Sequence, residues 1–284
     1  MARLSEQQRQ EIVKKYLSNL YTVKELAEEY SVNKTSVSRL LQRNGIELRN
    51  SRYHFNQDFF DVIDTEEKAY WLGFLYADGY INSKANKVSL RIKDNDAYIL
   101  EEFAKHLDSN IPIKYYTHTH QLPNSEKMHT LHYAELTICN INIKEDLIKH
   151  GCFENKTLIL NFPFHIPQEL YRHFIRGYMD GDGCITYGSK QKCGNRDFKV
   201  SFCGTQELLT GIQKIFGYNK TLTKRWNDNK NNYTLDISGN QQVYAFLTVL
   251  YDNAIIYLKR KHDRYLELKN TLSLSPVMEN EITT

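Results

Sequence analysis

Apolar and polar positions follow two different rhythms along the chain. Over residues 5–43 the apolar residues recur every three or four positions in three short runs, which is the spacing of one face of a helix. Ser5, Thr22 and Asn33 stand just before these runs, and such side chains accept hydrogen bonds from the first turn of a helix. We therefore predict three short helices at the N-terminus.

From residue 66 onwards, helical spacing and strand alternation follow one another in an order that occurs twice. The order is helix, two strands, helix, two strands, helix, and it begins again near residue 167. The alternating stretch KVSLRIK at residues 87–93 has an echo in KVSFCG at residues 199–204. Repetition on this scale indicates a duplicated unit. The predicted fold class is therefore α+β, with two αββαββα repeats after a small all-α segment.

One strand of the first repeat departs from simple alternation. In HTLHYAELTIC, residues 129–139, the apolar residues change parity near Tyr133–Glu135. An extra residue in one strand of a pair shifts the parity in this way. We therefore predict a β-bulge at this position.

Each repeat contains a distinctive stretch, WLGFLYADGYI at residues 71–81 and FIRGYMDGDGCI at residues 174–185. In both, two small residues stand four positions apart, and an acid and a glycine follow. Positions i and i+4 lie on one face of a helix, and small residues there let two backbones approach closely. The residues expected at this helix–helix interface are Gly73, Ala77, Gly177 and Gly181.

The acids Asp78 and Asp182 stand at the ends of these helices, just before the glycines expected to cap them. Side by side, the helices would bring the two carboxylates close together. Like charges and negative helix-dipole ends make that unfavourable for stability, whereas a divalent cation would offset both. An alternative stays open, in which these are ordinary core helices that end in Asp–Gly turns.

The two stretches resemble the paired signature of the LAGLIDADG homing endonucleases, in the single-chain form that carries both copies. The match holds at Gly73, Ala77, Asp78 and Gly79, and at Gly177, Asp180, Asp182 and Gly183. It departs at Tyr76, where the family often has an acid, and at Gly181, where it often has alanine.

The resemblance implies a monomer with internal pseudo-two-fold symmetry, whose two four-stranded sheets join as a saddle over double-stranded DNA. It implies site-specific hydrolysis of both strands, with Mg²⁺, or another divalent cation such as Mn²⁺, held by Asp78 and Asp182. The backbone carbonyls of Ala77 and Gly181 would help, since helix-terminal carbonyls lack intrahelical donors. Catalytic basic helpers are expected at Lys93, Lys156 and Lys261; for each, a solvated surface charge is the alternative.

The polar faces of the strands predict the surface that contacts DNA, because a two-stranded ribbon fits the major groove. The candidates in the first repeat are Asn82, Lys84, Ser89, Arg91, Lys114, Tyr116 and His118. Those in the second are Thr186, Lys190, Lys192, Lys199, Ser201, Thr223, Arg225 and Asn227. The alternative is an ordinary sheet with one wet face. Four histidines on neighbouring strands leave a zinc cluster as a further alternative: His118, His120, His129 and His132.

The three N-terminal helices, with a tight turn between the second and third, resemble the helix-turn-helix of recombinases and small regulators. The third helix would present these side chains to DNA: Lys34, Thr35, Ser36, Ser38, Arg39 and Gln42. Arg49 and Arg52 follow in a stretch suited to an arm along the DNA backbone or minor groove. A generic three-helix bundle and a plain linker are the alternatives.

Composition narrows the setting. The chain of 284 residues is 41% hydrophobic, and it has no apolar run long enough to cross a membrane. Its five cysteines form no CxxC pair, so neither a disulfide framework nor a cysteine zinc site is expected, and a cytoplasmic location fits. The net charge is only +3, and its excess lies in residues 1–52. Residues 53–284 would therefore bind a polyanion such as DNA through local clusters of basic side chains and not through their net charge.

We expect four segments in all: a helix-turn-helix DNA-binding domain over residues 1–50, a linker over 51–64, and LAGLIDADG repeats over 65–160 and 161–284. The expected function is that of a magnesium-dependent homing endonuclease, and a phage- or intron-encoded setting is implied by the resemblance. The alternative is a non-cutting DNA-binding transcription regulator or an intron RNA maturase on the same scaffold. Retention of both acids favours cutting, because a pure binder has no need of two carboxylates facing a phosphate backbone.

Overall fold

The computed structural model describes residues 4–18, 21–46, 48, 53–121, 128–188, 197–225 and 230–273. Met1–Phe55 with Asp108–Ile111 form one compact unit, and Asn56–Leu107 with Pro112–Thr284 form a second, larger one. None of the described helices is long and apolar enough to cross a membrane.

The N-terminal unit is built from three short helices, α1 (Glu6–Leu17), α2 (Val23–Glu29) and α3 (Lys34–Arg43). Each begins at its predicted cap. Ser5 and Thr22 form reciprocal capping boxes, and the Asn33 side chain accepts a hydrogen bond from the Thr35 N–H. The helices bury one apolar cluster between them, made of Ile12, Tyr16, Leu26, Ala27, Val37 and Leu41.

The first repeat of the larger unit forms a four-stranded antiparallel sheet in the order β1-β2-β4-β3. Its elements are α4 (Glu66–Asp78), β1 (Gly79–Asn82), β2 (Lys87–Lys93), α5 (Tyr98–His106), β3 (Lys114–Gln121), β4 (Met128–Cys139) and α6 (Ile141–Lys149). The Thr65 side chain caps α4 by accepting from the Lys68 N–H. The helix ends at Asp78, where the sequence predicts its end.

The second repeat forms an equivalent four-stranded sheet in the order β5-β6-β8-β7. Its elements are α7 (Tyr171–Asp182), β5 (Cys184–Tyr187), β6 (Phe198–Gly204), α8 (Gln206–Phe216), β7 (Thr223–Lys224), β8 (Tyr233–Ser238) and α9 (Asn240–Tyr251), and α10 (Lys259–Ser273) follows. The matching strand orders confirm the predicted α+β fold of two αββαββα repeats.

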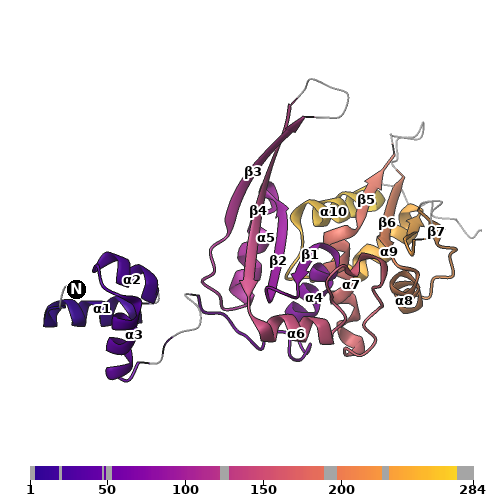
Figure 1. Cartoon of the computed structure of the whole chain (residues 1–284). Coiled ribbons are helices and arrows are strands. Elements are labelled where there is room, and N and C mark those ends of the chain that lie inside the picture. The colour runs from indigo at the N-terminus through magenta and orange to yellow at the C-terminus, as the bar shows by residue number, and fades with distance from the viewer. Residues whose placement is uncertain are drawn as a thin grey trace, which may run out of the picture. The chain divides into compact units, whose positions relative to one another are not determined.

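The predicted β-bulge in β4 is wrong. Tyr133, Ala134 and Glu135 pair without interruption with β2 on one side and with β3 on the other. The apolar pattern changes parity because Leu131 lies on the same face as Glu135 and is exposed, whereas Ala134 faces the core. Residues 128–132 of β4 pair with β3 alone, and in this part the two strands project past the rest of the sheet (Figure 1).

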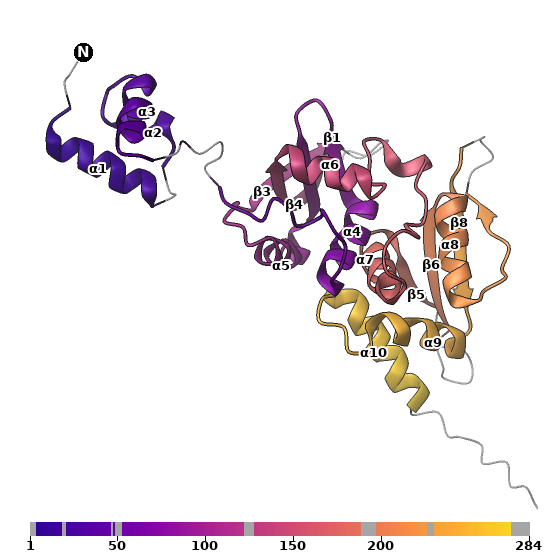
Figure 2. The same ribbon diagram turned by 90° about the horizontal axis from the view of Figure 1, so that it is seen from below.

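Helices α4 and α7 lie side by side between the two sheets (Figure 2). Helices α5 and α6 pack on the first sheet, and α8 and α9 pack on the second. The strand residues that face the helices are buried: Val88, Leu90, Leu136, Val200, Phe202 and Leu235. Because side chains alternate along a strand, the opposite face of each sheet carries the polar positions.

Part of the segment expected to be a linker, residues 51–64, belongs to the core instead. Phe59, Phe60 and Ile63 are buried, and the Phe60 ring lies 6.4 Å from the ring of Phe103 in α5. Burial of large apolar side chains is strongly favourable, so residues 59–63 are fixed against the first repeat. Residues 51 and 52 lie outside the described part of the chain.

Candidate metal centre and DNA-binding surface

The two motif helices, α4 and α7, touch through their backbones. A Cβ atom on Gly73 would lie 2.0 Å from the carbonyl oxygen of Phe174, and one on Gly177 would lie 1.9 Å from a carbonyl oxygen of α4. Nearer the helix ends, a Cβ on Gly181 would lie 2.2 Å from that of Ala77. No larger residue fits at these three glycines without separating the helices. The small residues therefore bring the two helix ends together.

Asp78 and Asp182 end these helices and face the same space. A carboxylate oxygen of Asp78 lies 3.5 Å from the point where a Cβ on Gly181, the neighbour of Asp182, would stand. Both side chains reach solvent, yet protein atoms displace part of their hydration. Burial, and then the charge of Asp182, raises the pKa of Asp78 to about 6. Burial raises the pKa of Asp182 as well, against the opposing charges of Lys261 and Lys156.

Two buried lysines hold the ends of the motif helices. Lys156, 8% exposed, donates to the carbonyl oxygen of Gly79, just past Asp78. Lys261, 3% exposed, donates to the last three carbonyl oxygens before Asp182, at 2.5, 2.7 and 3.3 Å. Burial lowers the pKa of Lys261 to about 8, although nearby carboxylates oppose the shift. Neither lysine is the solvated surface charge that stood as the alternative.

The position two residues before each acid differs between the repeats. In α7 it is Asp180, a buried carboxylate that accepts from the hydroxyls of Tyr70 at 2.9 Å and Tyr251 at 2.6 Å, and from the Leu258 N–H at 2.8 Å. In α4 it is Tyr76, whose hydroxyl donates to a backbone carbonyl after α6 at 2.5 Å. Burial raises the pKa of Asp180 despite its donors. The three donors tie α4, α9 and the segment before α10 to one carboxylate of α7.

Lys93 lies at the end of β2 and is exposed. In the register of the two sheets its counterpart is Thr205. That threonine is buried, caps α8, and donates to the carbonyl oxygen of Leu160. A basic side chain therefore stands at this place in one repeat and a structural hydroxyl in the other.

The donor set suits a hard divalent cation. The carboxylates of Asp78 and Asp182, with the carbonyl oxygens of Ala77 and Gly181, are all oxygen ligands, the kind that Mg²⁺ prefers. Burial is the main cause of the raised pKa of Asp78, and a cation between the two acids would relieve the repulsion from Asp182 that adds to it. The Gly181 carbonyl also accepts from Lys261. Within the described ranges, no group of three or more His, Cys, Asp and Glu could hold a metal, and this includes the histidines of β3 and β4.

Comparison with known families matches the LAGLIDADG-like domain to residues 65–148 and again to residues 169–250. Together the two matches cover more than half of the chain. The chain belongs to the LAGLIDADG-like domain family. The predicted relation to LAGLIDADG proteins with two motifs in one chain is confirmed.

Several solved structures of LAGLIDADG proteins are similar to this chain. LAGLIDADG meganuclease I-AabMI bound to uncleaved DNA is 11% identical with a TM-score of 0.47, and the match covers 74% of this chain and 92% of that chain. The I-LtrWI LAGLIDADG homing endonuclease bound to target DNA is 12% identical with a TM-score of 0.47, over 77% and 92% of the two chains. LAGLIDADG meganuclease I-CpaMI bound to uncleaved DNA is 11% identical with a TM-score of 0.42, over 73% and 90%. A search of curated proteins finds no match.

The polar faces of the two LAGLIDADG sheets hold most of the predicted DNA contacts. Residues paired across strands share a face, which places together Asn82, Ser89, Arg91, Lys114, Tyr116 and His118 in the first sheet. The same rule places together Thr186, Lys199, Ser201 and Thr223 in the second. Lys84 is exposed in the turn after β1, and Arg225 directly follows β7. Ser89 is only 5% exposed, so its hydroxyl offers little surface to a ligand.

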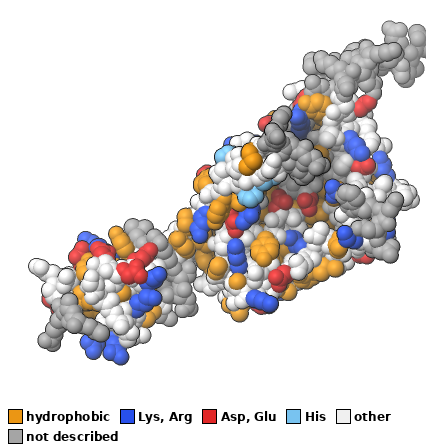
Figure 3. Space-filling model, turned by 45° about the horizontal axis from the view of Figure 1, so that its top comes forward, with side chains coloured by type: hydrophobic (Ala, Val, Ile, Leu, Met, Phe, Trp, Pro, Cys, Tyr) orange, Lys and Arg blue, Asp and Glu red, His pale blue; other side chains and the backbone are white. Residues whose placement is uncertain are grey.

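Figure 3 shows acidic side chains near the middle of one face of the larger unit, with Lys, Arg and His side chains around them. Five predicted contacts lie outside the residues that the structure describes: Arg49, Arg52, Lys190, Lys192 and Asn227.

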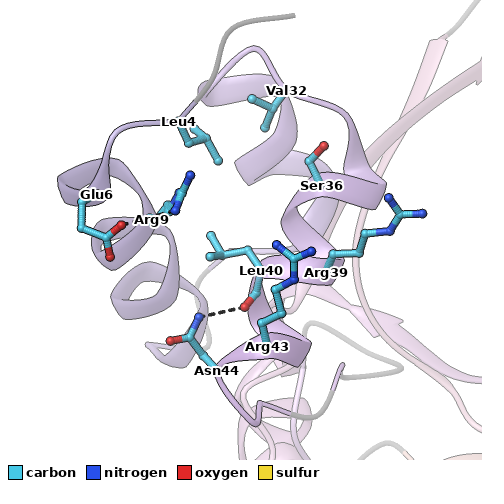
Figure 4. A pocket seen from close by; sticks show the side chains of 9 residues that line it. All are labelled: Leu4, Glu6, Arg9, Val32, Ser36, Arg39, Leu40, Arg43 and Asn44. Atoms are coloured by element: carbon cyan, nitrogen blue, oxygen red, sulfur yellow. Dashed lines mark hydrogen bonds and ion pairs between the residues drawn. The ribbon is translucent and has the colours of Figure 1, made fainter.

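On α3, the six predicted contact residues are exposed or partly exposed: Lys34, Thr35, Ser36, Ser38, Arg39 and Gln42. Ser36 and Arg39 also line a hollow between α1 and α3 (Figure 4). Arg9 and Arg43 lie on opposite sides of this hollow, with Leu40 between them. Arg9 pairs with Glu6 at 3.4 Å. Three arginines and one glutamate line this hollow, so it is predominantly basic. It includes Arg9 and Arg43, which the sequence-based prediction of DNA contacts left out.

Sequence reasoning did not find the partners of Asp180. Tyr251 lies 71 positions away and Tyr70 lies 110 positions away, so no local pattern connects them. The available signal was Asp180 itself, because a carboxylate inside an apolar helix requires buried donors.

Proposed function

We propose that the protein is an endonuclease that cuts both strands of double-stranded DNA at a specific site, using a divalent cation, as a homing endonuclease does. The observation that carries the proposal is the meeting of Asp78 and Asp182 where α4 and α7 end and the two sheets begin. Two carboxylates beside a phosphate backbone repel it, so a protein that only binds DNA is better without them. Membership of the LAGLIDADG family supports the same reading.

Asp78 and Asp182 would hold Mg²⁺ or Mn²⁺, with the carbonyl oxygens of Ala77 and Gly181 as further donors. When bound, such a cation lowers the pKa of bound water and neutralises charge on a phosphate. The chain's own contribution is placement. Backbone contact between α4 and α7 fixes the two carboxylates with little freedom to move apart, so their geometry is set before DNA arrives.

Lys156 and Lys261 would support the two carboxylates from the protein interior. Each amine donates hydrogen bonds to backbone carbonyl oxygen at a helix end, which keeps positive charge near the acids while DNA occupies the surface. This charge opposes the effect of burial on the pKa of Asp182, and it favours the ionised carboxylate that a cation needs. Lys93 is the exposed member of the three, so it is the one suited to contact a phosphate directly.

The polar faces of the two sheets would lie in the major groove on either side of the cut. Helix α3 of the N-terminal unit would add a second, separate contact, because linking two binding modules raises the effective concentration of the second. Deletion of residues 1–50 should weaken DNA binding by about a hundredfold and leave the larger unit folded. Binding titrations and circular dichroism of the shortened protein measure the two effects. A shortened protein that is unfolded would assign a structural role to this segment.

The endonuclease proposal is tested on two DNA substrates. In the first, the genomic sequences on either side of the gene are joined directly to each other; in the second, the intervening element still separates them. Full-length protein with Mg²⁺ should make a double-strand cut in the joined sequence and leave the interrupted sequence intact. EDTA should abolish the cut, and Asp78→Asn or Asp182→Asn should retain binding without cutting. Specific binding with no cut in either Mg²⁺ or Mn²⁺ would point to a regulator, and preference for the unspliced transcript would point to a maturase.

A further inference from the structure

An arginine in the first repeat is held in one orientation by its neighbours. Arg91 in β2 donates from Nε at 3.1 Å and from Nη2 at 2.6 Å to a single oxygen of Glu135 in β4. Its guanidinium carbon lies 4.7 Å from the ring centre of Tyr133 and 5.9 Å from that of Tyr116. All four side chains lie on the polar face of the sheet. The guanidinium is therefore fixed both in its own plane and above an aromatic ring.

Glu135 is unable to contact a ligand itself. Its side chain is 5% exposed, whereas that of Arg91 is 57% exposed. Its second oxygen accepts from Lys87 at 3.4 Å and from Thr137 at 3.0 Å. Burial alone would raise the pKa of Glu135, but the hydrogen bonds from Arg91 and Thr137 outweigh it and leave that pKa below its ordinary value. The carboxylate is thus ionised and engaged, and Arg91 is the group presented at the surface.

The edge of Arg91 that faces away from Glu135 has a specific shape. An arginine carries five N–H donors, of which two point to Glu135. Of the remaining three, one on Nη1 and one on Nη2 point in parallel from the end of the guanidinium and form a flat two-donor edge, whereas the second on Nη1 points toward the Cδ side. Such an edge matches the O6 and N7 acceptors of guanine in the major groove, the commonest specific contact between proteins and DNA. Because the guanidinium is already held, little side-chain freedom is lost when it binds.

The second repeat has nothing equivalent at this position. In the register of the two sheets, Cys203 corresponds to Arg91, and its partner across the strand is Thr234. Neither residue can form a charged fork. Any recognition that depends on Arg91 is therefore confined to one half of the molecule.

We propose that Arg91 reads one guanine in the half of the DNA target that the first repeat covers, with Glu135 as the positioning residue beneath it. This inference rests on the proposed function, since it requires the polar face of the first sheet to lie against DNA. The equivalent place in the second repeat has no such reader, so we expect the target to be asymmetric at this pair of positions.

The test selects bound duplexes from a double-stranded DNA library with a randomised central segment. The parent protein is the full-length chain with Asp182→Asn, which holds DNA without cutting it. Its enriched motif should contain one strongly preferred G·C pair whose preference falls about tenfold or more with Arg91→Lys, while the other positions stay unchanged. Lysine keeps the charge but not the fork. Cys203→Ala, at the equivalent place in the second repeat, is the matched control and should leave the whole motif unchanged.

Glu135→Gln separates positioning from folding. It removes one negative charge, so total DNA affinity should hold or rise, while preference at the same G·C pair falls. A folding defect would instead lower affinity for every sequence alike. If Arg91 contacts a phosphate, Arg91→Lys weakens binding evenly across sequences, and that result overturns the inference, as does an unchanged motif. If the parent retains no duplex DNA at all, the proposed function fails and the inference fails with it.

Discussion

The two repeats share a frame, and they differ in the polar groups built on it. Each places a helix with small residues against its twin and ends that helix at an aspartate where a sheet begins. Two residues earlier, the first repeat has Tyr76 and the second has the buried carboxylate of Asp180. The supporting lysines also differ, since Lys156 holds a carbonyl beyond its acid and Lys261 holds the carbonyls before its acid. Helix contact and the paired acids are thus common to both repeats, whereas the other buried polar groups and their hydrogen-bond partners differ between them.

The sheets differ in reach as well. Strands β3 and β4 have 8 and 12 residues, whereas β7 and β8 have 2 and 6. At the rise of a strand, about 3.4 Å per residue, the first hairpin extends farther than the second within the described residues. If the polar faces lie along DNA, the first repeat covers more base pairs. The paired acids are therefore placed alike in the two repeats, whereas the described strands of the two sheets differ in length.

The largest effect is expected where the two repeats contribute equally to the frame. Gly73→Ala and Gly177→Ala would each put a Cβ within 2.0 Å of a backbone carbonyl oxygen of the facing helix. Each should therefore lower the free energy of unfolding by about 3 kcal/mol or more, as measured by urea denaturation. Gly188, which has open space around a Cβ, is the matched control, and Gly188→Ala should change stability by less than about 0.5 kcal/mol. A midpoint at the wild-type urea concentration for either helix variant would show that the backbones do not touch.

The next effect concerns the acids, where the repeats are again equivalent. Asp78→Asn and Asp182→Asn should each lower the rate of double-strand cleavage by about a hundredfold or more, because each removes one of the two charges proposed to hold the cation. Conversion of a supercoiled plasmid that carries the target measures nicked and linear products separately. The two losses should be similar. Cleavage at the wild-type rate by either variant removes that acid from the centre.

A smaller effect separates the repeats. Asp180→Asn leaves one acceptor oxygen for three buried donors, so it should lower the free energy of unfolding by about 2 kcal/mol. Tyr76→Phe removes a single hydrogen bond at the equivalent position and should cost about 1 kcal/mol. Denaturation of both variants under the same conditions gives the comparison. Equal losses, or a larger loss for Tyr76→Phe, would contradict the different roles assigned to the two positions.

The smallest effect is a dependence on pH. Because the pKa of Asp78 is raised to about 6, the folded chain holds a proton between about pH 4 and pH 6 that the unfolded chain has released. Without metal, stability should therefore fall as pH rises through this window. Asp78→Asn should be more stable than wild type at about pH 7 and lose this advantage near pH 4. Thermal melts with EDTA measure it, and a difference that is constant with pH would contradict the raised pKa.

The same titration predicts a linkage to the cation. Mg²⁺ needs the ionised carboxylates and competes with protons for them. Stabilisation by Mg²⁺ should therefore grow as pH rises through about 6, in wild type but not in Asp78→Asn. Melting points with and without Mg²⁺ at each pH provide the measurement. An equal Mg²⁺ effect in the two proteins would mean that the ion binds elsewhere.

The sequence predicted those features that depend on neighbours in the chain. The helix caps at Ser5, Thr22 and Asn33 come from single residues with strong local preferences. The predicted β-bulge was wrong because Leu131 is exposed, and the sequence pattern does not distinguish an exposed apolar residue from one in the core. It also treated Phe60 as part of a linker, since one short apolar cluster does not reveal what it packs against. The donors of Asp180 come from distant segments, and only the folded chain brings them together.

The most direct test of the shared centre is Mn²⁺ binding, measured by titration calorimetry on wild type, Asp78→Asn, Asp182→Asn and the double variant. If the two carboxylates hold one cation, either single substitution should weaken binding almost as much as both together, and the losses will be far from additive. Losses that add, or a single variant that binds Mn²⁺ as tightly as wild type, would show that the two acids do not share an ion.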